Sequence, residues 1–73
     1  MIRYRPIQTC DPVGGFTTYG IIGEENEEST WRAVSVVKDV TSNGQFAVEL
    51  AEKFTRGQLS PLHLLDVIMD SLP

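Results

Sequence analysis

The last third of the chain carries the start and stop signals of two helices, and no other feature constrains the fold as strongly. From residue 42 onward, apolar residues recur every third or fourth position instead of every second. Ser42 followed by Gln45 is typical of a capping box, and Gly57 suits the left-handed position after a helix. Ser60 and Pro61 predict the start of a second helix that runs to the end of the chain.

Each predicted helix has one apolar stripe. The stripes consist of Phe46, Leu50 and Phe54 in the first helix and of Leu64, Leu65, Ile68, Met69 and Leu72 in the second. Residues three or four apart lie on the same side of a helix, so both stripes are expected to pack on a common surface.

Three segments before the helices read as strands, namely residues 2–10, 16–23 and 31–40, which are rich in β-branched and aromatic residues. The order predicts an α+β fold, a three-stranded antiparallel β-meander followed by two α-helices packed on one face (β-β-β-α-α). Residues 1–73 are expected to form a single small domain, because the chain is too short for two.

Three places in these strands carry their own predictions. Pro6 has no N–H, so the first strand is expected to lie at an edge or to be interrupted near its middle. Gly20 inside the second strand indicates a bulge or a close approach of another backbone. The acidic segment 24–29 is expected to be a solvated loop, because its like charges repel one another.

The third strand is partly apolar on both faces. Two-residue alternation assigns Trp31, Ala33, Ser35 and Val37 to one face and Arg32, Val34, Val36, Lys38 and Val40 to the other. A sheet covered by helices on one side only should alternate more cleanly. We therefore expect a second copy of the chain to cover the other face, in a homodimer or another homo-oligomer, and the alternative partner is another protein.

Composition narrows the class of protein. The 73 residues include one cysteine, Cys10, so no disulfide can form within the chain. The N-terminus lacks the pattern of a signal peptide, and the apolar runs are far too short to span a membrane. These observations predict a cytoplasmic protein that does not associate with membranes.

Binding to nucleic acid is not expected. The formal charge is −4, opposite to the usual electrostatic footprint of such proteins. The second helix carries no Lys or Arg that would contact DNA, so a nucleic-acid regulator would depend on Arg3, Arg5 and Arg32.

Two sets of residues are candidates for chemistry, and each lacks partners that the chemistry requires. His63, Asp66 and Asp70 share one side of the second helix, but a closed metal site needs further ligands. Cys10 as a nucleophile would need a paired base such as His63 and an oxyanion site. We expect no enzyme activity, no cofactor and no resident metal, with a solvated polar face on the helix and a packing role for Cys10.

Large amphipathic side chains provide the candidates for an interaction surface. Tyr4, Tyr19 and Trp31 either fill the small core or anchor a partner, since Trp and Tyr are enriched in interface hot spots. The predicted interaction surface consists of these three residues and Val37, on the sheet face that bears Trp31. The resulting hypothesis is a non-enzymatic protein–protein interaction module, and the alternative is a regulatory protein that binds a small ligand or metal at His63 and Asp66.

Residues 16–73 also resemble a family of short uncharacterised Firmicutes proteins, a domain of unknown function. The resemblance rests on Tyr19-Gly20-Ile21, on residues 37–41, and on residues 59–70 with the pattern Ser-Pro-x-His-Leu-x-Asp-Val at 60–67. It implies a bacterial cytoplasmic protein and brings no activity or site with it. Within the pattern His63 stands at the start of the helix, where either a structural role near the cap or a functional role is open.

Overall fold

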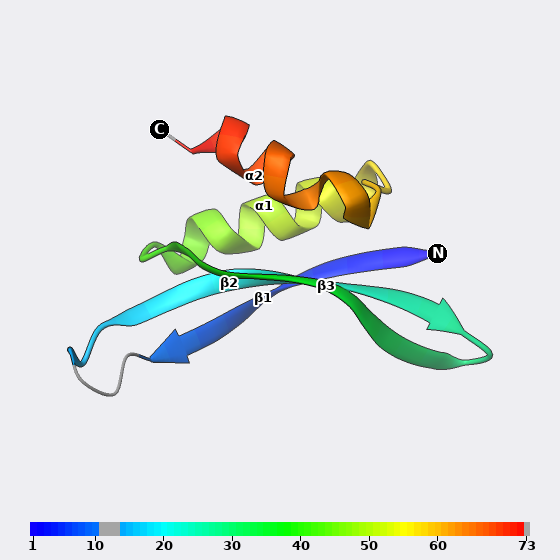
Figure 1. Ribbon diagram of the computed structural model, residues 1–73, viewed down its shortest axis with the longest axis horizontal. Helices are drawn as coiled ribbons and strands as arrows, with labels where there is room; N and C mark the ends of the chain where they lie inside the picture. The colour runs from blue at the N-terminus through cyan, green and yellow to red at the C-terminus, as the bar shows by residue number, and fades with distance from the viewer. Residues whose placement is uncertain (11–13, 73) are drawn as a thin grey trace.

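A computed structural model describes residues 1–10 and 14–72 of the protein. Its elements follow the order β1 (Ile2–Cys10), β2 (Thr17–Glu27), β3 (Thr30–Thr41), α1 (Gly44–Arg56), the 3₁₀ turn η1 (Pro61–His63) and α2 (Leu64–Ser71). The three strands form one antiparallel sheet in the order β1-β2-β3, and both helices lie on the same side of it (Figure 1). This confirms the predicted α+β meander with two helices on one face.

The core lies between the helices and the sheet. It consists of Tyr4, Ile21, Ala47, Leu50, Ala51, Phe54, Leu64 and Ile68. The rings of Tyr4 and Phe54 meet edge to face, with centroids 5.9 Å apart, and the Tyr4 ring lies over Gly23, where a Cβ would collide with it. The sequence therefore places a glycine opposite the large aromatic ring of Tyr4.

The boundaries of α1 agree with the prediction, whereas the second predicted helix begins as the 3₁₀ turn η1 and is α-helical only over Leu64–Ser71. Two capping residues of α1 also differ. Asn43, not Ser42, is the N-cap of α1, and its side chain accepts a hydrogen bond from the Phe46 N–H at 3.2 Å. Gly57 has a right-handed conformation with φ −83°, and the left-handed residue is Gln58 with φ 50°. Ser60 caps η1 as predicted. No helix of the described residues is long and apolar enough to cross a membrane.

Strand β1 is a continuous edge strand. Pro6 pairs in register with Ile21, so of the two predicted alternatives the edge position is found and the interruption is not. On this face, α1 packs chiefly on β1, whereas α2 packs on β3 at the other edge of the sheet.

Strand β2 is longer than predicted. It continues through the acidic segment to Glu27, so the expected solvated loop over 24–29 is wrong for most of its length. Glu24 is only 8% exposed, because two arginines of β1 neutralise it. The like charges of neighbouring glutamates point to alternate faces of the strand, which reduces the repulsion that favoured a loop.

Two register shifts between β2 and β3 change the predicted faces of the third strand. Ser35 and Val37 pair with Gly23 and Ile21 on the helix side, whereas Ala33 pairs with Glu24 on the open side. Trp31, opposite Asn26, also lies on the open side. The prediction that Trp31 and Val37 share a face is therefore wrong, because a bulge inverts the alternation between them.

The second shift explains Gly20. A Cβ there would overlap the Val37 carbonyl oxygen of β3, so the predicted close backbone approach is confirmed. Strand β3 carries its extra residues next to this contact, where Asp39 adopts a left-handed conformation with φ 54°.

Candidate interaction surfaces

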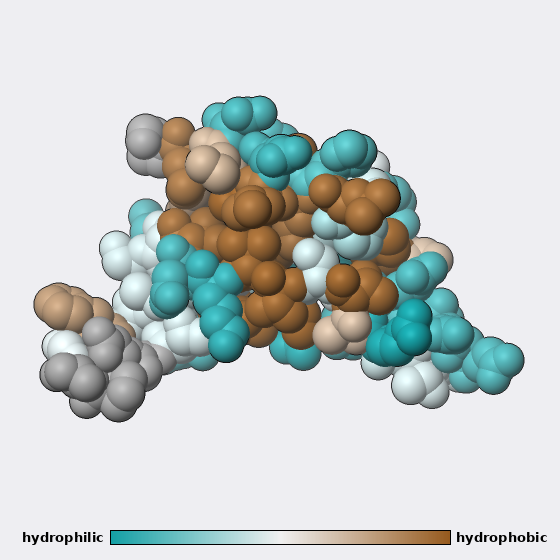
Figure 2. Space-filling model, in the orientation of Figure 1, coloured by the Kyte–Doolittle hydropathy of each residue, from teal (hydrophilic) through white to brown (hydrophobic). Residues whose placement is uncertain are grey.

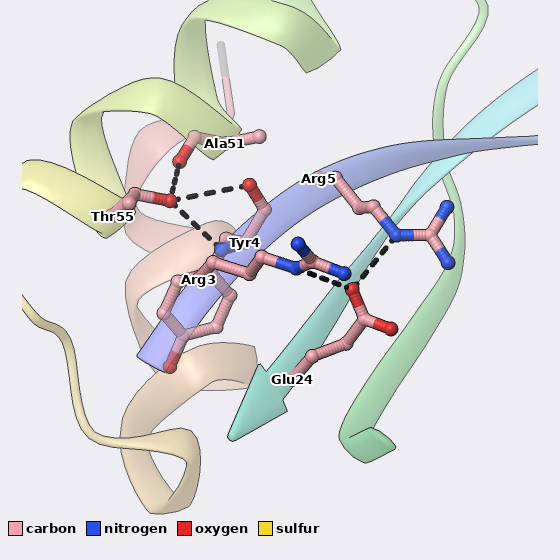
Figure 3. A network of polar contacts seen from close by, with 6 residues as sticks. All are labelled: Arg3, Tyr4, Arg5, Glu24, Ala51 and Thr55. Atoms are coloured by element: carbon pink, nitrogen blue, oxygen red, sulfur yellow. Dashed lines mark hydrogen bonds and ion pairs between the residues drawn. The ribbon is translucent and has the colours of Figure 1, made fainter. Parts of the chain in front are cut away.

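The open face of the sheet carries an ion-pair cluster near one end. Glu24 Oε1 accepts hydrogen bonds from Arg5 Nε at 2.8 Å and from Arg3 Nε at 3.0 Å (Figure 3). The Arg5 hydrogen bond, supported by Arg3, holds the pKa of the Glu24 carboxylate below its usual value, although burial acts in the opposite direction. The cluster keeps a buried carboxylate ionised between two half-exposed guanidinium groups.

Trp31 belongs to the same cluster. The Arg3 guanidinium carbon lies 4.0 Å from the centroid of the Trp31 ring, a cation–π arrangement. Trp31 is half-buried under this stack. Much of the ring is thus already occupied by a neighbour within the chain.

A second polar cluster lies near the other end of the open face. Asp39 accepts hydrogen bonds from the hydroxyl groups of Thr18 at 2.6 Å and Thr9 at 3.3 Å. The left-handed Asp39 turns its carboxylate onto β1 and β2, so this cluster holds the β3 bulge in place.

The outer edge of β1 is closed by side chains from the end of α1. Thr55 Oγ1 accepts the Tyr4 N–H at 2.8 Å and lies 3.2 Å from the Tyr4 carbonyl oxygen (Figure 3). The Gln58 amide pairs with the Ile2 N–H at 3.1 Å and with the Ile2 carbonyl at 2.9 Å. These two side chains occupy the backbone groups that an additional strand would bind, and Pro6 presents no N–H farther along.

The outer edge of β3 is open. The backbone groups of Ile2 and Tyr4 point outward from β1, and successive residues of a strand point their backbone groups to opposite sides. In β2, the backbone groups of Ile21 and Gly23 therefore point toward β3, and those of Ile22 point toward β1. Val36, the partner of Ile22, therefore points its N–H and C=O away from the sheet. Within residues 1–10 and 14–72, no hydrogen bond to the outward groups of β3 is found.

Helix α2 has an apolar side that the core does not cover. Successive residues turn by ~100°, which separates the buried positions Leu64 and Ile68 from a neighbouring side. That side consists of Leu62, Leu65, Met69 and Leu72, which are 89%, 54%, 64% and 38% exposed. The prediction that Leu65 and Met69 belong to the packed stripe is therefore wrong.

This exposed side is continuous with neighbouring apolar surface. Figure 2 shows hydrophobic surface over α2 that reaches down to the strands, with polar surface above it. Leu72 also lines a groove of about 280 Å³ with Thr41, Asn43 and Phe46, at the junction of β3 and α1. We call the outer edge of β3 and the exposed apolar side of α2 the β3–α2 surface.

The predicted polar cluster stays on the solvent side. His63, Asp66 and Asp70 are all exposed on η1 and α2, away from the exposed apolar side. In the described part of the chain, no three His, Cys, Asp or Glu side chains are close enough to hold a metal ion. His63 makes no side-chain cap of α2. The Cys10 side chain lies outside the described residues.

The four residues predicted as an interaction surface lie apart. Tyr4 is in the core, where burial raises its pKa and its hydroxyl donates to the Leu59 carbonyl. Tyr19 and Val37 pack against the same core from the helix side. Trp31 alone lies on the open face, so these residues do not form one patch.

The comparison with known proteins identifies a family of the chain. The model of a family of unknown function, DUF6514, matches residues 2–73. The chain belongs to this family. The match covers all six elements, so the DUF6514 domain is the whole sheet-and-helix unit. Neither a curated protein nor a solved structure matches the chain.

Proposed function

We propose that this member of the family is a non-enzymatic protein–protein interaction module that self-associates as a homodimer through the β3–α2 surface. The observation that carries the proposal is the exposed apolar side of α2. Its residues Leu62, Leu65 and Met69 are each more than half exposed. Helix α2 packs on β3, whose outward backbone groups have no hydrogen-bond partner among residues 1–10 and 14–72. Contiguous exposed apolar surface of this kind marks association sites in soluble proteins.

The size of the chain supports the same conclusion. A domain of 73 residues buries a smaller fraction of its surface than larger domains do, and small domains are often stabilised by association. A standard interface removes roughly 800 Å² from each partner. That is about a sixth of the accessible surface of 4946 Å².

The proposal moves the interface away from Trp31. The Trp31 ring is covered by Arg3, and the open sheet face there carries three charged side chains held by ion pairs. The β3–α2 surface instead groups its apolar residues, while Asp66 and Asp70 lie on another side of the helix. A cytoplasmic location and a Firmicutes origin belong to the proposal as well, on the resemblance described above.

The test is the mass in solution. Multi-angle light scattering at rising concentration should approach twice the chain mass of 8.1 kDa. The variant Leu65→Glu/Met69→Glu should remain monomeric with an unchanged circular dichroism spectrum, because both side chains are exposed in the single chain. Val48→Glu is the matched control, since Val48 is an exposed apolar residue of α1 and should leave the dimer intact. A wild-type mass of one chain at millimolar concentration refutes self-association.

A further inference from the structure

We infer that two copies pair their β3 strands antiparallel, edge to edge, to form one six-stranded sheet centred on Val36. This inference rests on the proposed self-association and names how the surface is used. The open groups of β3 carry it, because backbone N–H and C=O groups at a sheet edge are a template for a further strand.

The difference between the two edges selects the occupant. At β1, the backbone groups of Ile2 and Tyr4 are bound by Gln58 and Thr55 of the same chain. Because Ile2 and Tyr4 are bound and Pro6 has no N–H, β3 is the more open edge of the described sheet. Pairing at β3 gives each copy one partner, so the assembly closes as a two-fold dimer. With both edges open, the same chemistry would produce an open-ended fibre.

The position of the axis follows from the ladder. A two-fold axis normal to the sheet places one residue opposite its own copy, and the two copies of that residue exchange hydrogen bonds only if it points its backbone outward. Val36 does so, whereas Ser35 pairs toward β2. With the axis at Val36, about residues 34–38 of the two copies pair. An axis at Ser35 would place Arg32 directly opposite Lys38 of the second copy, and the axis at Val36 avoids this repulsion.

The helices provide the side-chain part of the interface. Because α2 packs over β3, a continuous sheet places the two α2 helices next to each other across the axis. The exposed side with Leu65 and Met69 then becomes covered, and the acidic residues Asp66 and Asp70 stay on a different side of each helix. Pairing of five residues is too small for a standard interface, so both parts are needed.

The decisive variant is Val36→Pro, which removes the outward N–H. The fold already accepts proline at an outward position, since Pro6 lies two residues from the outward-pointing Tyr4. Two-fold symmetry doubles the loss to two hydrogen bonds, so the dissociation constant of the dimer should rise by about 30-fold. Val36→Thr is the matched control, because it keeps the N–H and should change the constant by less than about 3-fold.

A second measurement does not depend on a variant. In the wild-type dimer, the Val36 amide should exchange with deuterium at least about tenfold more slowly at concentrations that favour the dimer than at high dilution. Fast exchange at every concentration, or a dimer that Val36→Pro leaves intact, overturns strand pairing. In that case a wild-type mass of two chains still upholds self-association, whereas a monomeric wild type overturns both.

Discussion

Replacement of Thr55 by valine should destabilise the protein by about 2 kcal/mol, although the two side chains have nearly the same shape. The hydroxyl oxygen accepts the Tyr4 N–H at 2.8 Å and lies 2.9 Å from the Ala51 carbonyl oxygen. Tyr4 is only 5% exposed, so its N–H has no hydrogen-bond acceptor once valine replaces Thr55. An unpaired buried donor costs ~1–3 kcal/mol, and the Ala51 carbonyl keeps its place in the helix ladder.

The assay is urea and thermal unfolding followed by far-UV circular dichroism, at a protein concentration where the chain is monomeric. For a domain of this size, 1 kcal/mol corresponds to ~4–8 °C, so the midpoint should fall by about 8–16 °C. Thr55→Ser keeps the hydroxyl and should recover most of the loss. Thr30→Val makes the same chemical change at an exposed strand position and should shift the midpoint by less than about 3 °C.

Two results would contradict this reasoning. A loss below about 0.5 kcal/mol for Thr55→Val means that water or a backbone shift satisfies the Tyr4 N–H equally well. An equal loss for Thr55→Ser means that the methyl group, not the hydroxyl, is what β1 requires. In either case the Thr55 hydroxyl closes the β1 edge without adding to the free energy of unfolding.

Three further predictions concern the sheet. Gly20→Ala should lower the free energy of unfolding in urea by about 2–3 kcal/mol, because the added Cβ would overlap a carbonyl oxygen of β3. Gly57→Ala is the control and should be neutral or slightly stabilising, because Gly57 has an ordinary φ and space for a Cβ. Folding lowers the pKa of Glu24, so its ion pairs contribute fully to stability above pH 4.5 and are lost as the pH falls through the folded pKa. Glu24→Gln should flatten that part of the curve of stability against pH and cost about 1–2 kcal/mol at pH 7. An unchanged decrease in stability at acidic pH contradicts this prediction. Tyr4→Phe removes one hydroxyl hydrogen bond and should lower stability by about 1–2 kcal/mol in the same assay, while an unchanged midpoint means that the bond contributes nothing net.

The element order was predictable because its signals are local. The change of apolar period near residue 42 and the Ser60-Pro61 cap depend on neighbours within a few positions. Helix α1 begins at Gly44, and the second helical segment begins at Pro61 as a 3₁₀ turn that becomes α-helix at Leu64. The choice of Asn43 over Ser42 as N-cap shows the limit of such signals. Both residue types cap helices well, and only the backbone of Asn43 is extended with its side chain aimed at Phe46.

The faces of β3 were not predictable by alternation, because a single inserted residue inverts everything beyond it. Gly20 did indicate an irregularity, and the contact with Val37 is its cause. Nothing in the sequence marks the other register shift, between Gly23 and Glu24. The same shift places Trp31 beside Arg3 and separates it from Val37, so the predicted patch divides between two faces.

The closed edge of β1 was beyond the sequence for a different reason. Thr55 and Gln58 look like solvent-facing residues at a helix end, and their partners lie 51 and 56 positions away in the chain. A threonine hydroxyl and a glutamine amide each offer a donor and an acceptor, which is what an edge residue of a strand presents. No spacing rule relates such pairs, so only the tertiary arrangement identifies them.

On the proposed pairing of β3 strands, the two edges of the sheet limit association to two copies. Arg32 and Lys38 bracket an uncharged segment of β3 over residues 33–37, and charged residues at such positions limit how far a second strand can extend. If Thr55→Val were combined with Gln58→Ala, the β1 edge would present free backbone groups at Ile2 and Tyr4. A chain with two open edges is able to propagate, so light scattering of that double variant should show species larger than two chains. Since neither side chain belongs to the β3–α2 surface, growth beyond two copies would arise from the opened edge alone.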